Sequence, residues 1–204
     1  PHFFREPDWN NDLFDGFGLD MPQFERMPER PPRATEPNLL YFLHKEMQER
    51  GIKKELVHLE SYFPPSHPLA LGYRGQADSV VRTAVLSLAM GTTKFLGCWS
   101  LHDSADRWGS QHYGSAGLIG RAPEFNPKPA AAAYATMSRV LDLAKFDGWL
   151  PTGSRSAYCV RFRDAGKMIY CLWTIRGSRP LTLKLRAGRG KATAVDENGN
   201  ESAL

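Results

Sequence analysis

Glu55-Leu56-Val57-His58-Leu59-Glu60 is the stretch of sequence that decides the fold. Three of its six residues are apolar, and the loop that follows, residues 62–68, holds three prolines that cannot supply the backbone donors of a sheet. The pattern predicts a buried strand that ends just after Glu60. In α/β proteins, a side chain at the carboxyl end of such a strand is placed where ligands bind.

Further strands and helices are predicted on both sides of this strand. Residues 15–21 and 92–100 have the composition of short buried strands. Gly51 and Gly91 suit the ends of two helices, and apolar residues at helical spacing predict three helices, over residues 35–51, 76–90 and 129–146. Strands that alternate with helices form parallel sheets covered by helices. The fold class is therefore predicted to be α/β.

The character of the chain changes near residue 148. Apolar residues recur at helical spacing before it and alternate after it. Residues 1–60 carry 8 basic and 12 acidic side chains, whereas residues 148–204 carry 10 basic and 4 acidic ones. We therefore predict two domains, residues 1–148 and residues 149–204, of which the second is a small antiparallel β domain that is incomplete.

A hairpin is predicted in the second domain, around Asp164-Ala165-Gly166. A three-residue loop there would set Cys159 opposite Cys171, close enough in principle for a disulfide, although two small buried thiols are the favoured interpretation. It would also set Tyr158 opposite Leu172. Further strands are predicted at residues 181–185 and 192–195, with a type I′ turn at Asn198-Gly199.

The overall charge and hydropathy exclude two classes of partner. The net charge is only +4, without the concentrated positive field that nucleic acid requires. No apolar run is long enough to span a membrane. His-x-x-x-His and Cys-x-x-Cys spacings are absent, as are phosphate-binding glycine loops, so neither a metal nor a cofactor is predicted.

Polar and aromatic side chains gather where the three predicted parallel strands end. Flat rings stack on the apolar faces of sugars, while Asp, His and Gln bond to sugar hydroxyls, so this mixture predicts carbohydrate binding. The candidates follow the strands in chain order: Asp20 and Gln23; His58, Glu60 and Tyr62; Trp99, His102, Asp103 and Trp108.

Each candidate also has a plain structural interpretation. Under the two-residue period of a strand, His58 shares a face with Glu60, so it either tunes that carboxylate or is a satisfied core histidine. Glu60 itself could be a surface residue at the end of a strand, and Trp99 could belong to the core. Asp103 is a sugar ligand or a cap for its own loop.

The order and spacing of these segments resemble the last quarter of a retaining (β/α)8-barrel glycoside hydrolase of clan A. The resemblance implies strands six to eight of a (β/α)8 barrel, followed by the start of a β-sandwich-like domain. It implies that Glu60 is the nucleophile and that Trp99 lies beneath the sugar, with His102 and Asp103 as hydroxyl ligands. The segments that carry it are residues 55–60, residues 94–103, Gly117-Leu118 and Asn126-Pro127-Lys128-Pro129-Ala130.

A retaining glycosidase needs a second carboxyl group, about 5 to 5.5 Å from the first, as acid and base. In the family it belongs to an Asn-Glu-Pro motif on strand four, upstream of anything in this chain. Thr35-Glu36-Pro37 imitates the motif but is predicted to open a helix. The chain is therefore expected to be a fragment that is inactive alone. Its expected partners are an oligosaccharide or polysaccharide substrate and the missing half of the barrel or an oligomeric partner.

Two alternative functions stay open. In the first, the chain is a non-catalytic glycan-binding or structural module on a degenerate glycosidase fold, and Glu60 only accepts a hydroxyl. In the second, it is an intracellular α/β enzyme of another chemistry, which would need a cofactor motif. Residue 1 is Pro rather than Met, so the location is left open, with a secreted or periplasmic one favoured over the cytoplasm.

Overall fold

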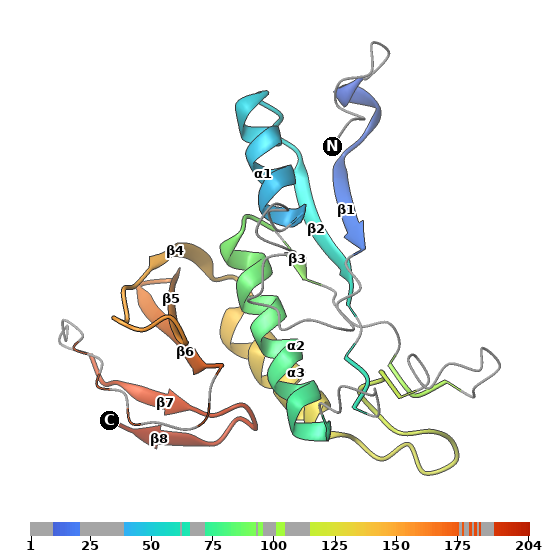
Figure 1. The fold of residues 1–204 in the computed structure, drawn as a ribbon, viewed down its shortest axis with the longest axis vertical. Helices are drawn as coiled ribbons and strands as arrows, with labels where there is room; N and C mark the ends of the chain where they lie inside the picture. The colour runs from blue at the N-terminus through green and yellow to red at the C-terminus, as the bar shows by residue number, and fades with distance from the viewer. Residues whose placement is uncertain are drawn as a thin grey trace.

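The computed structural model describes residues 10–20, 39–61, 63–65, 72–92, 94–95, 101–104, 115–175, 177, 180, 182, 184 and 190–204. Figure 1 shows helices packed between small sheets. The elements in chain order are a short 3-10 helix η2 (Asn11–Leu13), β1 (Gly16–Asp20), α1 (Leu39–Glu49), β2 (Glu55–Glu60), α2 (Gly72–Ala89), β3 (Lys94–Phe95), α3 (Pro129–Leu141), β4 (Lys145–Trp149), β5 (Ala157–Asp164), β6 (Lys167–Thr174), β7 (Thr193–Val195) and β8 (Glu201–Ala203).

The first sheet is parallel, with the strand order β1-β2-β3. This confirms the predicted α/β arrangement, and β2 has the predicted bounds. Of the third predicted strand, only Lys94–Phe95 is a strand among the described residues, because residues 96–100 lie outside them. The barrel itself stays a prediction.

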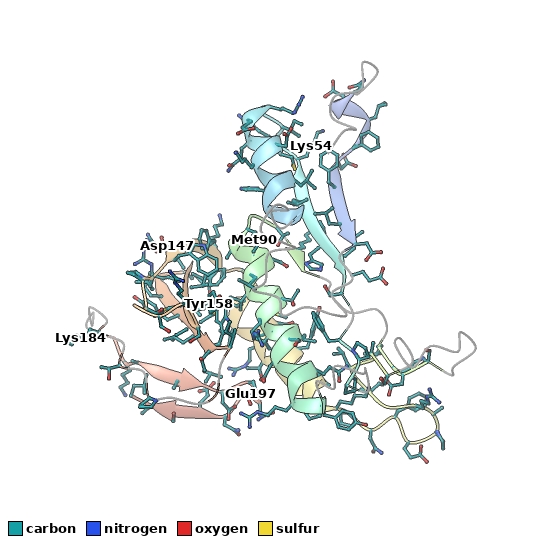
Figure 2. All side chains as sticks on the ribbon, in the orientation of Figure 1. Lys54, Met90, Asp147, Tyr158, Lys184 and Glu197 are labelled. Carbon is teal, nitrogen blue, oxygen red and sulfur yellow. The ribbon has the colours of Figure 1, made fainter. Side chains whose placement is uncertain are left out.

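A first apolar core lies between α1 and this sheet. Leu43 and Met47, one turn apart on α1, pack with Leu56 of β2 and with partly buried neighbours from β1. Met90, labelled in Figure 2, joins this core from the end of α2. Gly51 follows α1 with a φ of 66°, the left-handed conformation expected of a helix-ending glycine. The predicted cap, Thr35, lies outside the described residues.

A second core joins helices α2 and α3 to the antiparallel sheet β4-β5-β6. Ala84 and Val85 of α2 meet Met137 of α3, and Val160 and Phe162 of β5 complete the cluster. In Figure 1 this sheet lies beside the helix pair. The predicted domain boundary at residue 148 falls within β4, and the division into two domains stays a prediction.

The predicted end of the third helix is wrong. The helix α3 ends at Leu141, and Lys145–Trp149 forms strand β4 instead of a helical end and a loop. Phe146 pairs with Phe162 of β5, and their rings form an edge-to-face contact with centroids 6.1 Å apart. Pairing with a distant strand therefore overrides the local helical spacing.

The β5-β6 hairpin forms, but its predicted register is wrong by one residue. Ala165 and Gly166 both have positive φ, 41° and 84°, as a two-residue type I′ turn requires, and this turn matches the twist of the strands. Cys159 consequently faces Leu172 rather than Cys171, and both thiols are free. Tyr158 lies opposite Trp173 instead of Leu172, and the two rings stack at 5.3 Å.

The C-terminal hairpin is formed by β7 and β8, and β7 confirms most of the predicted strand at residues 192–195. The turn is not type I′, because only Gly199 has positive φ. Asp196 organises it instead, since its Oδ1 accepts the backbone N–H groups of Asn198 and Asn200, both at 2.9 Å. Figure 2 shows Glu197 at the tip of this hairpin, toward α2 and α3.

Two further expectations are only partly covered by the described residues. Residues 182 and 184 are not in a strand, and the rest of the predicted strand 181–185 lies outside the description. None of the helices in the described ranges is both long and apolar enough to cross a membrane.

Candidate functional site

A β-bulge lies at the carboxyl end of the pair β1-β2. The strands pair in step as far as Leu19 and His58, and then the register shifts so that Asp20 lies opposite Glu60. Leu59 is left unpaired, and its side chain fills the space over Gly18, where an added Cβ would clash with Leu59 Cδ1. Bulges of this kind redirect side chains and occur often beside active sites. Here the bulge sets the end of β2 beside the end of β1, as Figure 1 shows.

The bulge lies directly before Glu60. Burial still alternates along the end of β2, since Leu56 and His58 are buried, Leu59 is exposed and Glu60 is half-buried. The predicted shared face of His58 and Glu60 stays a prediction. Across the bulge, Glu60 lies opposite Asp20, an exposed residue whose neighbour Leu19 packs into the α1 core.

Burial raises the pKa of Glu60 above its ordinary value, and the charge and hydrogen bonding of Asp20 raise it further. The Oε1 atom of Glu60 is buried without a hydrogen-bond partner among the described residues. Neither Asp20 nor Glu60 takes part in any ion pair within the same ranges. Among the described residues, therefore, no cation compensates these two adjoining carboxyl groups.

His58 lies beneath this pair, 1% exposed. Its Nε2 is 3.1 Å from the carbonyl oxygen of Glu60 and 2.6 Å from Ser61 Oγ, and its Nδ1 is 2.6 Å from Ser87 Oγ on α2. Burial lowers the pKa of His58 to about 4, so the ring is neutral. A carbonyl only accepts, so Nε2 carries the proton and Nδ1 accepts from Ser87. His58 thus ties the backbone at Glu60 to α2.

Asp103 lies in a different environment. Its Oδ1 accepts a hydrogen bond from Lys128 Nζ at 2.5 Å and one from the backbone N–H of Gly117 at 3.1 Å. Lys128 also donates a hydrogen bond to the carbonyl of Ser115 at 2.7 Å. Lys128 directly precedes Pro129, the first residue of α3. The neighbouring His102 is exposed and donates from Nδ1 to the Asp103 carbonyl. Asp103 therefore fastens its loop to the start of α3.

The structure brings together some of the predicted site residues and leaves others undescribed. Asp20, His58 and Glu60 meet at the bulge, whereas His102 and Asp103 form a separate group around Lys128. The remaining candidates, and with them the distance from the indole to Glu60, lie outside the described residues: Gln23, Tyr62, Trp99 and Trp108.

Sequence reasoning missed the residues that hold these groups in place. Ser87 is a polar residue on the buried side of α2, which is the kind of position where a core partner for a histidine is expected. Lys128 belongs to the Asn126–Ala130 segment, but no role was predicted for it. The sequence feature that could have indicated one is a charged residue directly before an alanine-rich helix that starts with proline.

No other grouping in the described ranges offers clearer chemistry. Within them, no three His, Cys, Asp or Glu side chains are close enough to hold a metal ion. An open depression of about 550 Å³ lies in the antiparallel sheet, lined by residues 149–155 and 157–159, apart from the carboxyl pair.

Comparison with known proteins gives a match at the level of fold. No family model and no curated protein matches the chain. Among solved structures, a family 39 glycoside hydrolase from the gut symbiont Bacteroides cellulosilyticus WH2 superimposes with a TM-score of 0.67 at 19% sequence identity. The match covers 95% of this chain and 43% of that protein, so the chain spans less than half of its length. The chain thus has the fold of part of a glycoside hydrolase.

Proposed function

We propose that this chain is part of a retaining glycoside hydrolase in which Glu60 is the nucleophile. One observation carries the proposal: a bulge at the end of a parallel strand sets Glu60 opposite Asp20, and Glu60 Oε1 has no hydrogen-bond partner in the part of the chain that the structure describes. An unpartnered carboxylate oxygen is costly to bury and is what an attacking group needs. The shared fold with a glycoside hydrolase supports the class of reaction.

The chemistry follows the two-step retaining mechanism. Ionised Glu60 attacks the anomeric carbon and forms an ester with the sugar, while the departing oxygen takes a proton from an acid. Water, deprotonated by the same acid group, then breaks the ester and frees Glu60. His58 holds the backbone carbonyl of Glu60, which keeps the attacking group in position without a charge of its own.

Asp20 is not proposed as the acid. The bulge pairs it directly with Glu60 on the neighbouring strand, whereas the family's acid belongs to an Asn-Glu-Pro motif that is absent from this sequence. We therefore expect the acid to come from sequence that precedes Pro1 in the whole protein. Sugar contacts by Gln23, Tyr62, Trp99, Trp108 and His102 stay predictions. Asp103 Oδ1 is already bonded to Lys128 and Gly117, so only its other oxygen is left for a hydroxyl.

Substitution of Glu60 in the whole protein tests the proposal. Glu60→Gln should lower kcat for glycoside hydrolysis by about 10³-fold or more, because the amide does not attack. Glu55→Gln is the matched control, since Glu55 starts the same strand and forms only an exposed pair with Lys94 at 3.5 Å. In Glu60→Ala, added azide should restore turnover and yield a glycosyl azide of inverted configuration. Undiminished hydrolysis by Glu60→Gln would refute the assignment.

A glycan-binding module without catalysis is the second candidate. The raised pKa of Glu60 favours it, because a protonated carboxyl both donates to and accepts from a sugar hydroxyl. In that case the wild-type protein would bind oligosaccharides but hydrolyse none of them. Glu60→Gln, which also donates and accepts, would keep that binding.

A further inference from the structure

Phe125 has a backbone conformation that its residue type disfavours. Its φ is 46°, in the left-handed region that glycine adopts readily and that a side chain as bulky as phenylalanine avoids. Hydrogen bonds hold the loop in this shape: the N–H of Phe125 donates to the carbonyl of Arg121 at 3.0 Å, and the N–H of Gly120 donates to the carbonyl of Asn126 at 2.8 Å. The loop thus holds a strained residue at a position where glycine would be unstrained.

The packing of Phe125 explains little of this choice of residue. Phe125 is 45% exposed, so only part of its side chain is removed from water. Its ring meets the ring of His102, itself exposed, in an edge-to-face contact with centroids 5.9 Å apart. Strained residues of this kind occur most often where a side chain contacts a ligand. The strain therefore points to a ligand of the aromatic ring.

The loop that carries Phe125 lies on the carboxyl side of the parallel sheet. A helix that follows a parallel strand starts on this side, and α2 follows β2. Near the start of α2, Gln76 donates to the carbonyls of residues 116–117, both at 3.2 Å, and the ring of Tyr73 lies 5.8 Å from Lys128 Nζ. In Figure 1 the arrows of β1 and β2 point toward this loop. Ligands of parallel α/β proteins bind on this side.

We propose that Phe125 forms a subsite for a sugar ring of an oligosaccharide substrate, a ring other than the one that Glu60 attacks. The flat side chain stacks on the apolar face of the sugar, and the edge contact with His102 keeps its ring in place. Figure 1 shows the segment before α3 extending well past the ends of β1 and β2, which assigns it to a remote part of the substrate. This subsite deepens the proposed function and rests on it.

Two substitutions in the whole protein test the aromatic ring itself. The probes are cellohexaose, xylohexaose and mannohexaose, and calorimetric titration measures the Kd of each. Phe125→Leu keeps an apolar side chain at the strained position but has no flat face, so the Kd of the hexaose that binds should rise about 10-fold. Phe125→Tyr keeps the flat ring and should bind within about 2-fold of wild type.

Phe125→Gly tests the strain, and the chain offers a matched control. The Kd should rise as much as in Phe125→Leu, while Tm stays unchanged or rises, because glycine suits the left-handed conformation. Ala165→Gly is the control, since Ala165 also has a positive φ, 41°, in the β5-β6 turn. It should have an unchanged or higher Tm at an unchanged Kd. A Tm lowered by more than about 3 °C in Phe125→Gly would make Phe125 a residue of the fold and overturn the proposal.

Kinetics separate the subsite from the nucleophile. On a hexaose that the wild type hydrolyses, Phe125→Leu should raise KM about 10-fold with kcat within about 2-fold. On the glycosyl fluoride of the same sugar, which has no second ring, neither constant should change. If Phe125→Leu weakens binding but no hexaose is hydrolysed, the subsite stands and the proposed function fails. If hydrolysis depends on Glu60 but Phe125→Leu changes neither Kd nor KM, or if the wild type binds none of the three hexaoses, the subsite is refuted.

Discussion

Asp103 and Glu60 are both acidic side chains that follow predicted parallel strands, yet the protein treats them in opposite ways. Asp103 is 12% exposed and meets the ammonium of Lys128 at 2.5 Å, with a backbone N–H as a second donor. Glu60 meets another carboxyl group and has an oxygen without a partner in the described part of the chain. Compensated charge of the first kind serves the fold, whereas uncompensated charge of the second kind marks a place for a ligand.

The largest effect expected on stability comes from breaking the compensated pair. Asp103→Asn leaves Lys128, 6% exposed, without its counter-charge, and should lower the free energy of unfolding by about 3 kcal/mol or more. Urea denaturation of the whole protein measures this change. Lys45→Gln is the control, since Lys45 forms an exposed pair with Glu49 at 3.6 Å, and it should cost less than about 0.5 kcal/mol. A loss as small as that in Asp103→Asn would erase the contrast.

The next effect depends on pH and tests the support beneath Glu60. The folded pKa of His58 is about 4 against 6.5 for an ordinary histidine, so the fold favours the neutral ring. The stabilisation is complete above pH 6.5 and is lost as the pH falls toward 4, by about 3 kcal/mol in all. The free energy of unfolding between pH 7 and pH 4 measures it.

His58→Gln should remove this part of the pH dependence, while His102→Gln, an exposed histidine, should keep it. If His58→Gln does not fold, an NMR titration of the wild-type ring decides the point. A ring that titrates near pH 6.5 would show that His58 is not the buried neutral support described above.

The smallest stability effect is expected at the uncompensated pair. Glu60→Gln removes one of two adjoining acidic groups and supplies a donor, so the free energy of unfolding should stay the same or rise by about 1 kcal/mol at pH 7. Functional residues commonly lower the free energy of unfolding, whereas Asp103 is expected to raise it. A loss of 2 kcal/mol or more in thermal or urea unfolding would place Glu60 among the structural carboxylates.

The local parts of this arrangement could be predicted from sequence, because they depend on nearby residues. The strand at Glu55–Glu60 follows from its apolar run and the prolines after it, and the end of α1 follows from Gly51. The bulge could not be predicted, since it depends on how Leu59 fits over Gly18 in another strand.

Long-range partners explain the other differences. Asp103 and Lys128 are 25 residues apart, and no local pattern indicates that they meet. The strand β4 exists because Phe146 pairs with β5, whereas the residues around it continue a helical spacing. The hairpin register depended on whether its loop held two or three residues, a choice that the positive φ values of Ala165 and Gly166 decide.

Trapping the covalent intermediate in the whole protein tests the central claim most directly. A panel of 2-fluoro glycosides with good leaving groups slows the second step, so the sugar should remain on the nucleophile and add its mass to the protein. Peptide mapping should then place the label on Glu60, and Glu60→Gln should take up none. A label on Asp20, Asp103 or any other residue, or turnover of these glycosides by the Glu60→Gln protein, would contradict the account.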